Sequence, residues 1–222
     1  MIEAAPLPMP EQVYRQLRGR ILDGSLEPGR LLRQEEIARA LNVSRVPVRE
    51  AMGRLEVDGL IVLRPRRGYA VVRLEQQEIV EIFELRVVIE EHAAMVAARA
   101  RTPADVLEVE ALVGRMEAVA RRGGDYGAEW ARLNRDFHSR LVASGRRRRL
   151  SNVVDTLRDT VEAYVRTEMR LTGDVRNALA EHREMLEAFR AGDAAGLAQL
   201  SRRHVEGTAR RLIDGLRRRA VG

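Results

Sequence analysis

From residue 75 onward this 222-residue chain keeps one pattern, in which apolar residues recur every three to four positions. The stripe of the first long segment consists of Ile79, Ile82, Leu85 with Arg86, Ile89, Ala93 and Val96. This spacing predicts helices with one apolar face, and no alternation typical of strands interrupts it. We therefore expect an antiparallel all-helical bundle of six helices. The expected helices span residues 75–101, 103–122, 125–144, 147–170, 174–191 and 193–219.

Residues 1–74 show a different order of elements. Apolar spacing and turn residues predict helices at about 10–23, 33–41 and 44–58, with Asn42 in the tight turn and Ser44 as an N-cap. Two β-rich runs, 60–63 and 69–73, flank a basic turn and predict a hairpin. The chain is thus expected to be mainly α, with a winged helix-turn-helix domain over 1–74 and the helical bundle over 75–222.

The charge distribution favours a polyanionic partner for the N-terminal part. The chain has a net charge of +6, and all 39 basic residues are arginine. Residues 1–74 carry 13 arginines and 9 acidic residues, whereas the longer remainder carries 26 and 24. Arginine suits bidentate contacts with phosphates and guanine edges, although a GC-rich genome also explains the absence of lysine.

Composition also indicates the cellular compartment of the protein. It has no cysteine, no apolar run long enough to span a membrane, and no secretory signal pattern at its beginning. The absence of disulfides suits a reducing compartment. We expect a cytoplasmic protein without a membrane partner.

Basic side chains gather where a winged helix-turn-helix domain meets DNA. Arg45 and Arg49 lie four positions apart, on one face of the third helix and opposite its apolar stripe. The amino end of such a helix enters the major groove, where arginine recognises guanine. Arg66, Arg67 and Gly68 at the hairpin tip suit the adjacent phosphates or minor groove. The alternative is a solvated basic face on a small helical domain.

The segment Leu41-Asn42-Val43-Ser44-Arg45-Val46-Pro47-Val48-Arg49-Glu50-Ala51-Met52, with Leu55, Gly59-Leu60 and Arg66-Arg67-Gly68, resembles the DNA-binding domain of GntR-type regulators. The resemblance implies operator contacts by Ser44, Arg45, Arg49 and Gly68, and more weakly by Arg33. Val46 stands where the family usually has threonine, so we exclude it from the contacts. Glu35 replaces an arginine that touches DNA in some members, and no such contact is expected here.

Three histidines fall on the inward faces of three C-terminal helices: His138, His182 and His204. Imidazoles that converge inside a bundle are a usual way to hold a divalent metal, here zinc or nickel. Asn134, one turn before His138, is a candidate fourth ligand. The alternative is that each histidine is an ordinary hydrogen-bonded core residue. His92 lies beside its helix's stripe and is expected to be structural or exposed.

Asn134-x-x-Phe137-His138, Glu181-His182-Arg183, Gly192-Asp193 and His204 resemble the FCD effector domain of the FadR subfamily, in its six-helix VanR-type form. The resemblance implies a metal site and a small carboxylate effector. A carboxylate usually stands at the position of Asn134 in that family, and an amide weakens the attraction for a metal. Arg86 either pairs with the effector or forms a structural salt bridge with Glu90.

Together these features predict a homodimeric, ligand-responsive transcriptional regulator, with repression as the expected sign, that binds a palindromic operator. Two other classes remain as alternatives. A metalloenzyme would use the histidines to activate water, but no well-placed general base accompanies them. An architectural DNA-binding protein would respond to no effector, and the histidine and arginine constellation argues against it.

Overall fold

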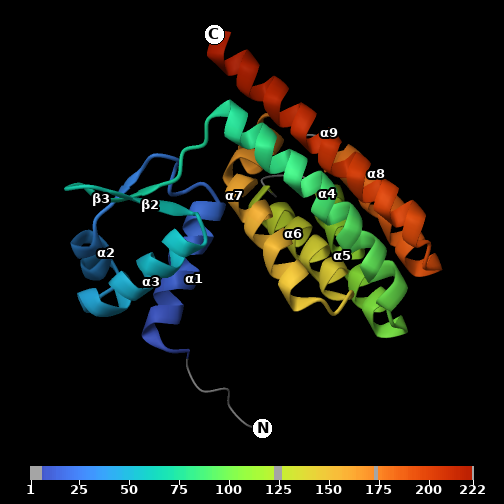
Figure 1. Ribbon diagram of the computed structural model, residues 1–222, viewed down its shortest axis with the longest axis horizontal. Helices are drawn as coiled ribbons and strands as arrows, with labels where there is room; N and C mark the ends of the chain where they lie inside the picture. Colours follow the sequence, from blue (N-terminus) through green and yellow to red (C-terminus); the bar gives the residue numbers. More distant parts are fainter. Residues whose placement is uncertain (1–6, 123–126, 173–174, 222) are drawn as a thin grey trace. The chain divides into compact units, whose positions relative to one another are not determined.

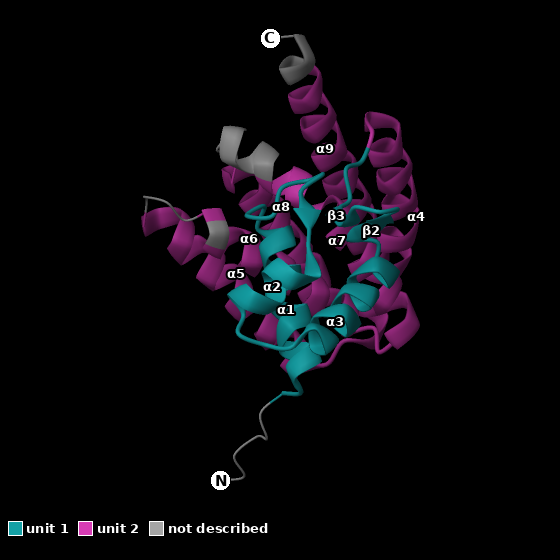
Figure 2. Ribbon diagram, turned by 90° about the vertical axis from the view of Figure 1, so that its left-hand side faces the viewer, with its two compact units in different colours: residues 1–74 teal, residues 75–222 magenta. Residues whose placement is uncertain are grey.

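The computed structural model describes residues 7–122, 127–172 and 175–221. The chain divides into two compact units, Met1–Leu74 and Glu75–Gly222, which are coloured separately in Figure 2. Each unit has its own hydrophobic core. None of the helices in the described ranges is both long and apolar enough to cross a membrane.

The N-terminal unit is a winged helix-turn-helix domain (Figure 1). Its helices are α1 (Met9–Leu22), α2 (Gln34–Ala40) and α3 (Arg45–Val57). Its strands are β1 (Leu31–Leu32), β2 (Ile61–Arg64) and β3 (Gly68–Val71), in the antiparallel order β1-β3-β2. The strand β1 was not expected from the sequence, because two residues are too few to show an alternating pattern.

The apolar faces of α1 and α3 form the core of this unit. Val48, Met52 and Leu55 of α3 are fully buried, and they belong to one cluster with Val13 and Leu17 of α1. Burying each of the larger side chains stabilises the fold by about 1.5–3 kcal/mol. Because the apolar stripe of α3 is buried against α1, the opposite face of α3 is exposed to solvent.

The turn between α2 and α3 depends on one left-handed residue. Asn42 has a φ of 53°, a conformation that asparagine tolerates better than most residues. The turn directs the chain into α3, whose N-cap is Ser44. The Ser44 side chain makes no capping hydrogen bond, so the position expected for Ser44 is confirmed but a capping bond is not.

The C-terminal unit contains six helices in the described part of the chain. They are α4 (Gln76–Ala100), α5 (Pro103–Arg122), α6 (Gly127–Ala143), α7 (Arg148–Thr172), α8 (Val175–Ala191) and α9 (Ala194–Val221). Helix α4 packs along α9 and also contacts α6, α7 and α8 (Figure 1). The predicted fold class, a winged helix-turn-helix followed by a helical bundle, is confirmed.

Large side chains from α5, α6 and α8 fill much of the bundle core. Trp130, Phe137 and Phe189 are fully buried and pack with Val109 and Met116 of α5. Phe137 also contacts the rings of His138 and His182, with centroid distances of 5.0 and 4.5 Å. The hydrophobic core therefore borders directly on the histidines, and it limits how their rings can turn.

Candidate functional site

The outer face of α3 carries the arginines predicted to contact DNA. Arg45 and Arg49 are exposed, whereas Pro47 and Val48 between them are buried. Ser44 at the helix start is exposed too. Because the buried stripe anchors the opposite face, this arrangement presents hydroxyl and guanidinium groups at the amino end of α3, where a DNA-binding helix contacts base edges and phosphates.

The hairpin between β2 and β3 presents the other predicted contacts. Arg66 and Arg67 are exposed in the turn, and Arg66 has a φ of 63°. Gly68 has a φ of 89°, and a β-carbon there would lie 3.3 Å from the carbonyl oxygen of Leu32. Glycine therefore fits this position both in backbone conformation and in space. Arg33 is exposed at the N-cap of α2.

An acidic residue of α2 contacts Arg45 on this basic face. A carboxylate oxygen of Glu35, on α2, lies 3.1 Å from a terminal nitrogen of Arg45. Both side chains are 66% exposed, so the pair itself contributes little stability, about 0.2–1 kcal/mol. Its importance is electrostatic, because it sets a negative charge beside a predicted base-contacting arginine.

In the C-terminal unit the three predicted histidines converge. His138 on α6, His182 on α8 and His204 on α9 are all buried, and one ring nitrogen from each lies within 4.8 Å of the others. The Nε2 atoms of His138 and His182 are 3.2 Å apart. The structure therefore brings together the three side chains that the sequence singled out, and it leaves His92 exposed on α4.

A carboxylate orients one of these rings. Nδ1 of His204 lies 2.5 Å from a carboxylate oxygen of Glu181. When Nδ1 donates its proton to Glu181, the lone pair is on Nε2, which is how histidine ligands are commonly prepared for metals. Glu181 also lies 3.7 Å from Arg211.

The other two imidazoles are uncharged at neutral pH. Burial is the main reason that the pKa values of His138 and His182 lie well below the usual value for histidine. The nearby charge of Arg158 lowers both pKa values further. Neutral rings keep a lone pair for a metal, and Nδ1 of His182 has no hydrogen-bond partner in the described part of the chain.

This donor set fits a divalent transition metal. Nitrogen ligands about 2.0–2.1 Å from a tetrahedral ion lie about 3.3 Å apart, close to the separation of the His138 and His182 nitrogens. A cation would also satisfy the two ring nitrogens that now face each other. Asn134 is half-buried and lines the same pocket as His138 and His204, where its amide oxygen is a candidate fourth ligand.

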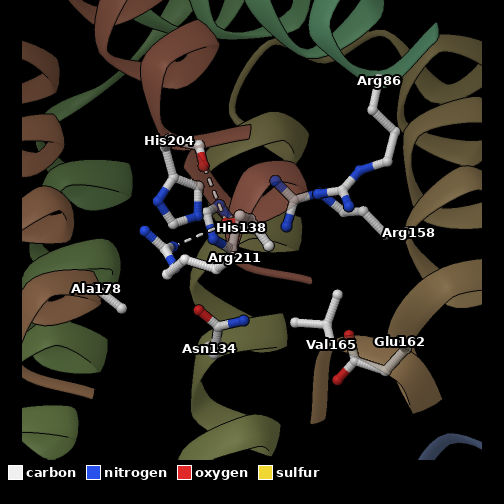
Figure 3. A pocket seen from close by; sticks show the side chains of 10 residues that line it. Arg86, Asn134, His138, Arg158, Glu162, Val165, Ala178, His204 and Arg211 are labelled. Atoms are coloured by element: carbon white, nitrogen blue, oxygen red, sulfur yellow. Dashed lines mark hydrogen bonds between the residues drawn. The ribbon is translucent and has the colours of Figure 1, made fainter. Parts of the chain in front are cut away.

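Arginines form another wall of this pocket. Figure 3 shows the guanidinium groups of Arg86 and Arg158 directed into the pocket that Asn134, His138 and His204 line. Arg86 donates from Nε to Glu90 at 2.8 Å, and Arg158 is hydrogen-bonded to the same carboxylate. The structural salt bridge between Arg86 and Glu90 is therefore present, and Arg86 also lines the pocket; its pairing with an effector stays a prediction.

The sequence analysis missed Arg158, which lines the pocket, and the role of Glu181, which contacts His204. Arg158 lies on the buried stripe of α7, four positions after Val154 and three before Val161, so its signal was a charged residue in an apolar stripe. Glu181 was noted only as a neighbour of His182 in the chain. Its contact with His204 joins α8 to α9, and no local pattern predicts such a pairing.

Comparison with known proteins places both units in described families. Residues 10–71 match the model described as bacterial regulatory proteins, gntR family, and residues 81–207 match the model of the FCD domain. The chain is 32% identical over 186 residues to the uncharacterized HTH-type transcriptional regulator YdhC of Bacillus subtilis, covering 82% of this chain and 81% of YdhC.

The chain belongs to the GntR family. It is also 26% identical over 200 residues to the HTH-type transcriptional repressor RspR of Escherichia coli, covering 90% of this chain and 86% of RspR. The solved structure of E. coli McbR/YncC has the same fold, with a TM-score of 0.83 and 21% identity over 95% of this chain and all of that one.

Membership of the GntR family makes the protein a transcriptional regulator that binds DNA through its N-terminal unit. The prediction of a regulator rather than an enzyme is confirmed, since the relatives are transcriptional regulators. The FCD match includes the three histidines and two of the arginines that line the pocket, Arg86 and Arg158.

Proposed function

We propose that this GntR-family regulator is a homodimeric repressor whose operator is a short palindrome, and that a small carboxylate effector binds beside a divalent metal in the FCD domain. The observation that carries the ligand-responsive part is the convergence of His138, His182 and His204. Two of them, His138 and His204, line a pocket together with Arg86. The similarity to RspR, a transcriptional repressor, supports repression as the sign of regulation.

The proposed operator contacts are divided between α3 and the wing. Arg45 and Arg49 recognise base edges in the major groove, and Ser44 contacts a phosphate. Arg66, Arg67 and Gly68 bind the backbone beside the site, with Arg33 in a supporting position. Two such units related by a two-fold axis match two inverted half-sites.

Replacing Arg45 by alanine tests the DNA contacts. DNA is first selected from a random-sequence pool by the wild-type protein, and inverted half-sites are expected in it. In gel-shift titrations, Arg45→Ala should bind this DNA at least about tenfold more weakly, because a bidentate arginine–guanine contact contributes about 1–3 kcal/mol. Arg132→Ala, an exposed position on α6, is the control. Unchanged sequence-specific binding by Arg45→Ala would exclude this contact.

The proposed metal site consists of His138, His182 and His204, with Asn134 as the fourth ligand. A zinc or nickel ion there would supply open coordination positions for a carboxylate oxygen. Glu181 holds the His204 ring in position, and Arg86 provides a positive charge for the effector. Helix α4, which carries Arg86, begins at the second residue of the C-terminal unit, so it follows the DNA-binding unit directly in the chain.

Elemental analysis tests the metal site. Protein purified without chelator or nickel resin should contain up to one equivalent of zinc or nickel per chain, and His182→Gln should lose it. His92→Gln changes an exposed histidine and should retain the metal. If wild-type protein has no metal, and added zinc leaves its melting temperature unchanged, the three histidines are core residues only.

A further inference from the structure

Val46 is an exposed apolar residue on the face of α3 that carries the proposed operator contacts. It is 52% exposed, whereas Pro47 and Val48, which follow it, are buried. It is the second residue of the helix, next to Arg45 and three positions before Arg49, and both arginines are exposed as well. Removing apolar surface from water is favourable, and the described part of the chain leaves much of this residue uncovered. Val46 can therefore gain free energy from an apolar partner outside the N-terminal unit.

The surroundings of Val46 suit an apolar partner better than a phosphate. Val46 lines a shallow hollow on the N-terminal unit, together with the apolar residues Met9 and Pro47. Within the described part of the chain, the one charged residue lining that hollow is Glu50, which is exposed one turn after Val46. Its carboxylate repels phosphates, and valine has no hydrogen-bonding group to offer them. Ser44 also lines the hollow, as the N-cap before the helix, and its hydroxyl serves the proposed phosphate contact.

The major groove of DNA offers an apolar group of its own, the 5-methyl group of thymine. The amino end of a recognition helix meets base edges there, and apolar side chains pack against this methyl group. Cytosine has no methyl group at the same position and presents an amino donor instead, which valine cannot accept. An exposed valine beside two guanine-reading arginines therefore favours a thymine next to the guanines.

We propose that Val46 is a specificity-determining residue that packs against the 5-methyl group of a thymine in each operator half-site. The inference rests on the proposed docking of α3 in the major groove and deepens it. Compared with threonine, valine loses a hydroxyl that can reach a phosphate and gains a second methyl group. The exclusion of Val46 from the contacts, which follows from the missing hydroxyl, therefore applies to phosphates and not to bases.

Replacing thymine by uracil tests this contact, because uracil pairs with adenine in the same way and lacks only the 5-methyl group. The full-length protein first selects its operator from a random-sequence DNA pool. Each thymine that recurs in the selected half-sites is then replaced by deoxyuridine in turn, and fluorescence anisotropy gives the Kd. At one of these thymines, the replacement should raise the Kd of the wild-type protein by about fourfold per half-site, which is the factor expected for one buried methyl group.

Val46→Ala assigns the methyl contact to this side chain. The variant should bind the unmodified operator more weakly, and it should lose most of the difference between thymine and uracil at the same position. The two changes, one in the protein and one in the DNA, form a double-mutant cycle that measures their coupling. The matched control is Val57→Ala, which makes the same change at the other end of α3, at a residue that is 87% exposed. It should keep the full difference between thymine and uracil.

The outcomes are distinct. A wild-type Kd that no uracil replacement changes, or a selected operator without thymine in its half-sites, overturns the inference. Retention of the full thymine–uracil difference by Val46→Ala also overturns it, because another residue then makes the contact. Unchanged operator binding by Arg45→Ala instead overturns the proposed docking of α3 itself. Circular dichroism identifies a variant that fails to fold, and Val46→Ser, which also removes both methyl groups, then takes the place of Val46→Ala with the same expected result.

Discussion

Glu35 places a negative charge next to Arg45, and DNA phosphates would compete with it for the same guanidinium. Before Arg45 can contact DNA, its ion pair with Glu35 must open or be shared. The carboxylate also repels phosphates directly, and this repulsion is weakened by salt. Glu35 is therefore expected to lower the affinity for DNA in general and to favour sites where Arg45 gains a guanine contact.

Glu35→Gln should bind DNA about two- to tenfold more tightly at low salt, because it removes a negative charge near phosphates. The gain should shrink as salt concentration rises, and the ratio of operator to random-sequence binding should fall. Fluorescence anisotropy at several salt concentrations measures both effects. Glu84→Gln, an exposed position on α4, makes the same charge change in the other unit as a control. Equal affinities of Glu35→Gln and wild type at low salt would show that Glu35 does not oppose binding.

At the level of single residues, the sequence identified the site residues whose inward orientation follows from helix periodicity. His138, His182 and His204 lie on apolar stripes, so their burial could be predicted without knowledge of how the helices pack. Their separation depends on the packing of α6, α8 and α9. The pairing of Arg158 with Glu90 likewise joins α7 to α4, and no local pattern contains that information.

At the level of elements, helices were easier to predict than strands. Both predicted bounds of α5 and the predicted end of α8 agree with the structure, and the other helix bounds differ by one or two residues. The starts predicted at residues 125 and 174 lie outside the described residues. Long amphipathic segments contain several periods, whereas β2 and β3 have four residues each. Strand β1 pairs with β3 through Leu31 and Leu32, and it is stabilised by that pairing rather than by its own pattern.

The wing provides a prediction of its own, because its tip carries two adjacent exposed arginines. Arg66→Ala with Arg67→Ala should weaken binding to operator and random DNA by similar factors, since phosphate contacts carry no sequence information. The slope of the logarithm of the DNA-binding constant against the logarithm of the salt concentration should fall in magnitude by about 1.8, because each phosphate contact contributes about 0.9. Arg121→Ala with Arg132→Ala makes the same charge change on α5 and α6 as a control. A loss confined to operator DNA would instead assign base contacts to the wing.

At the scale of the whole molecule, the proposed homodimer needs a surface on which two copies meet. Helix α4 exposes Leu85 and Val88, which are 58% and 70% exposed and lie three positions apart on one face. Val153 on α7, a helix that packs against α4, is 48% exposed. Exposed apolar side chains on one face of a helix are typical of protein interfaces, so the face of α4 that carries Leu85 and Val88 is the expected dimer contact.

Replacing Leu85 and Val88 by glutamine should therefore shift the protein from dimer to monomer in light scattering coupled to gel filtration, because it removes apolar area that the interface would bury. The monomer should keep its helical circular dichroism, since both side chains point to solvent. It should also bind a palindromic operator far more weakly and a single half-site with unchanged affinity, because only the dimer engages two half-sites together. Leu107→Gln, which changes a residue on α5 that is 65% exposed, should remain dimeric. A double variant that stays dimeric would place the interface elsewhere on the molecule.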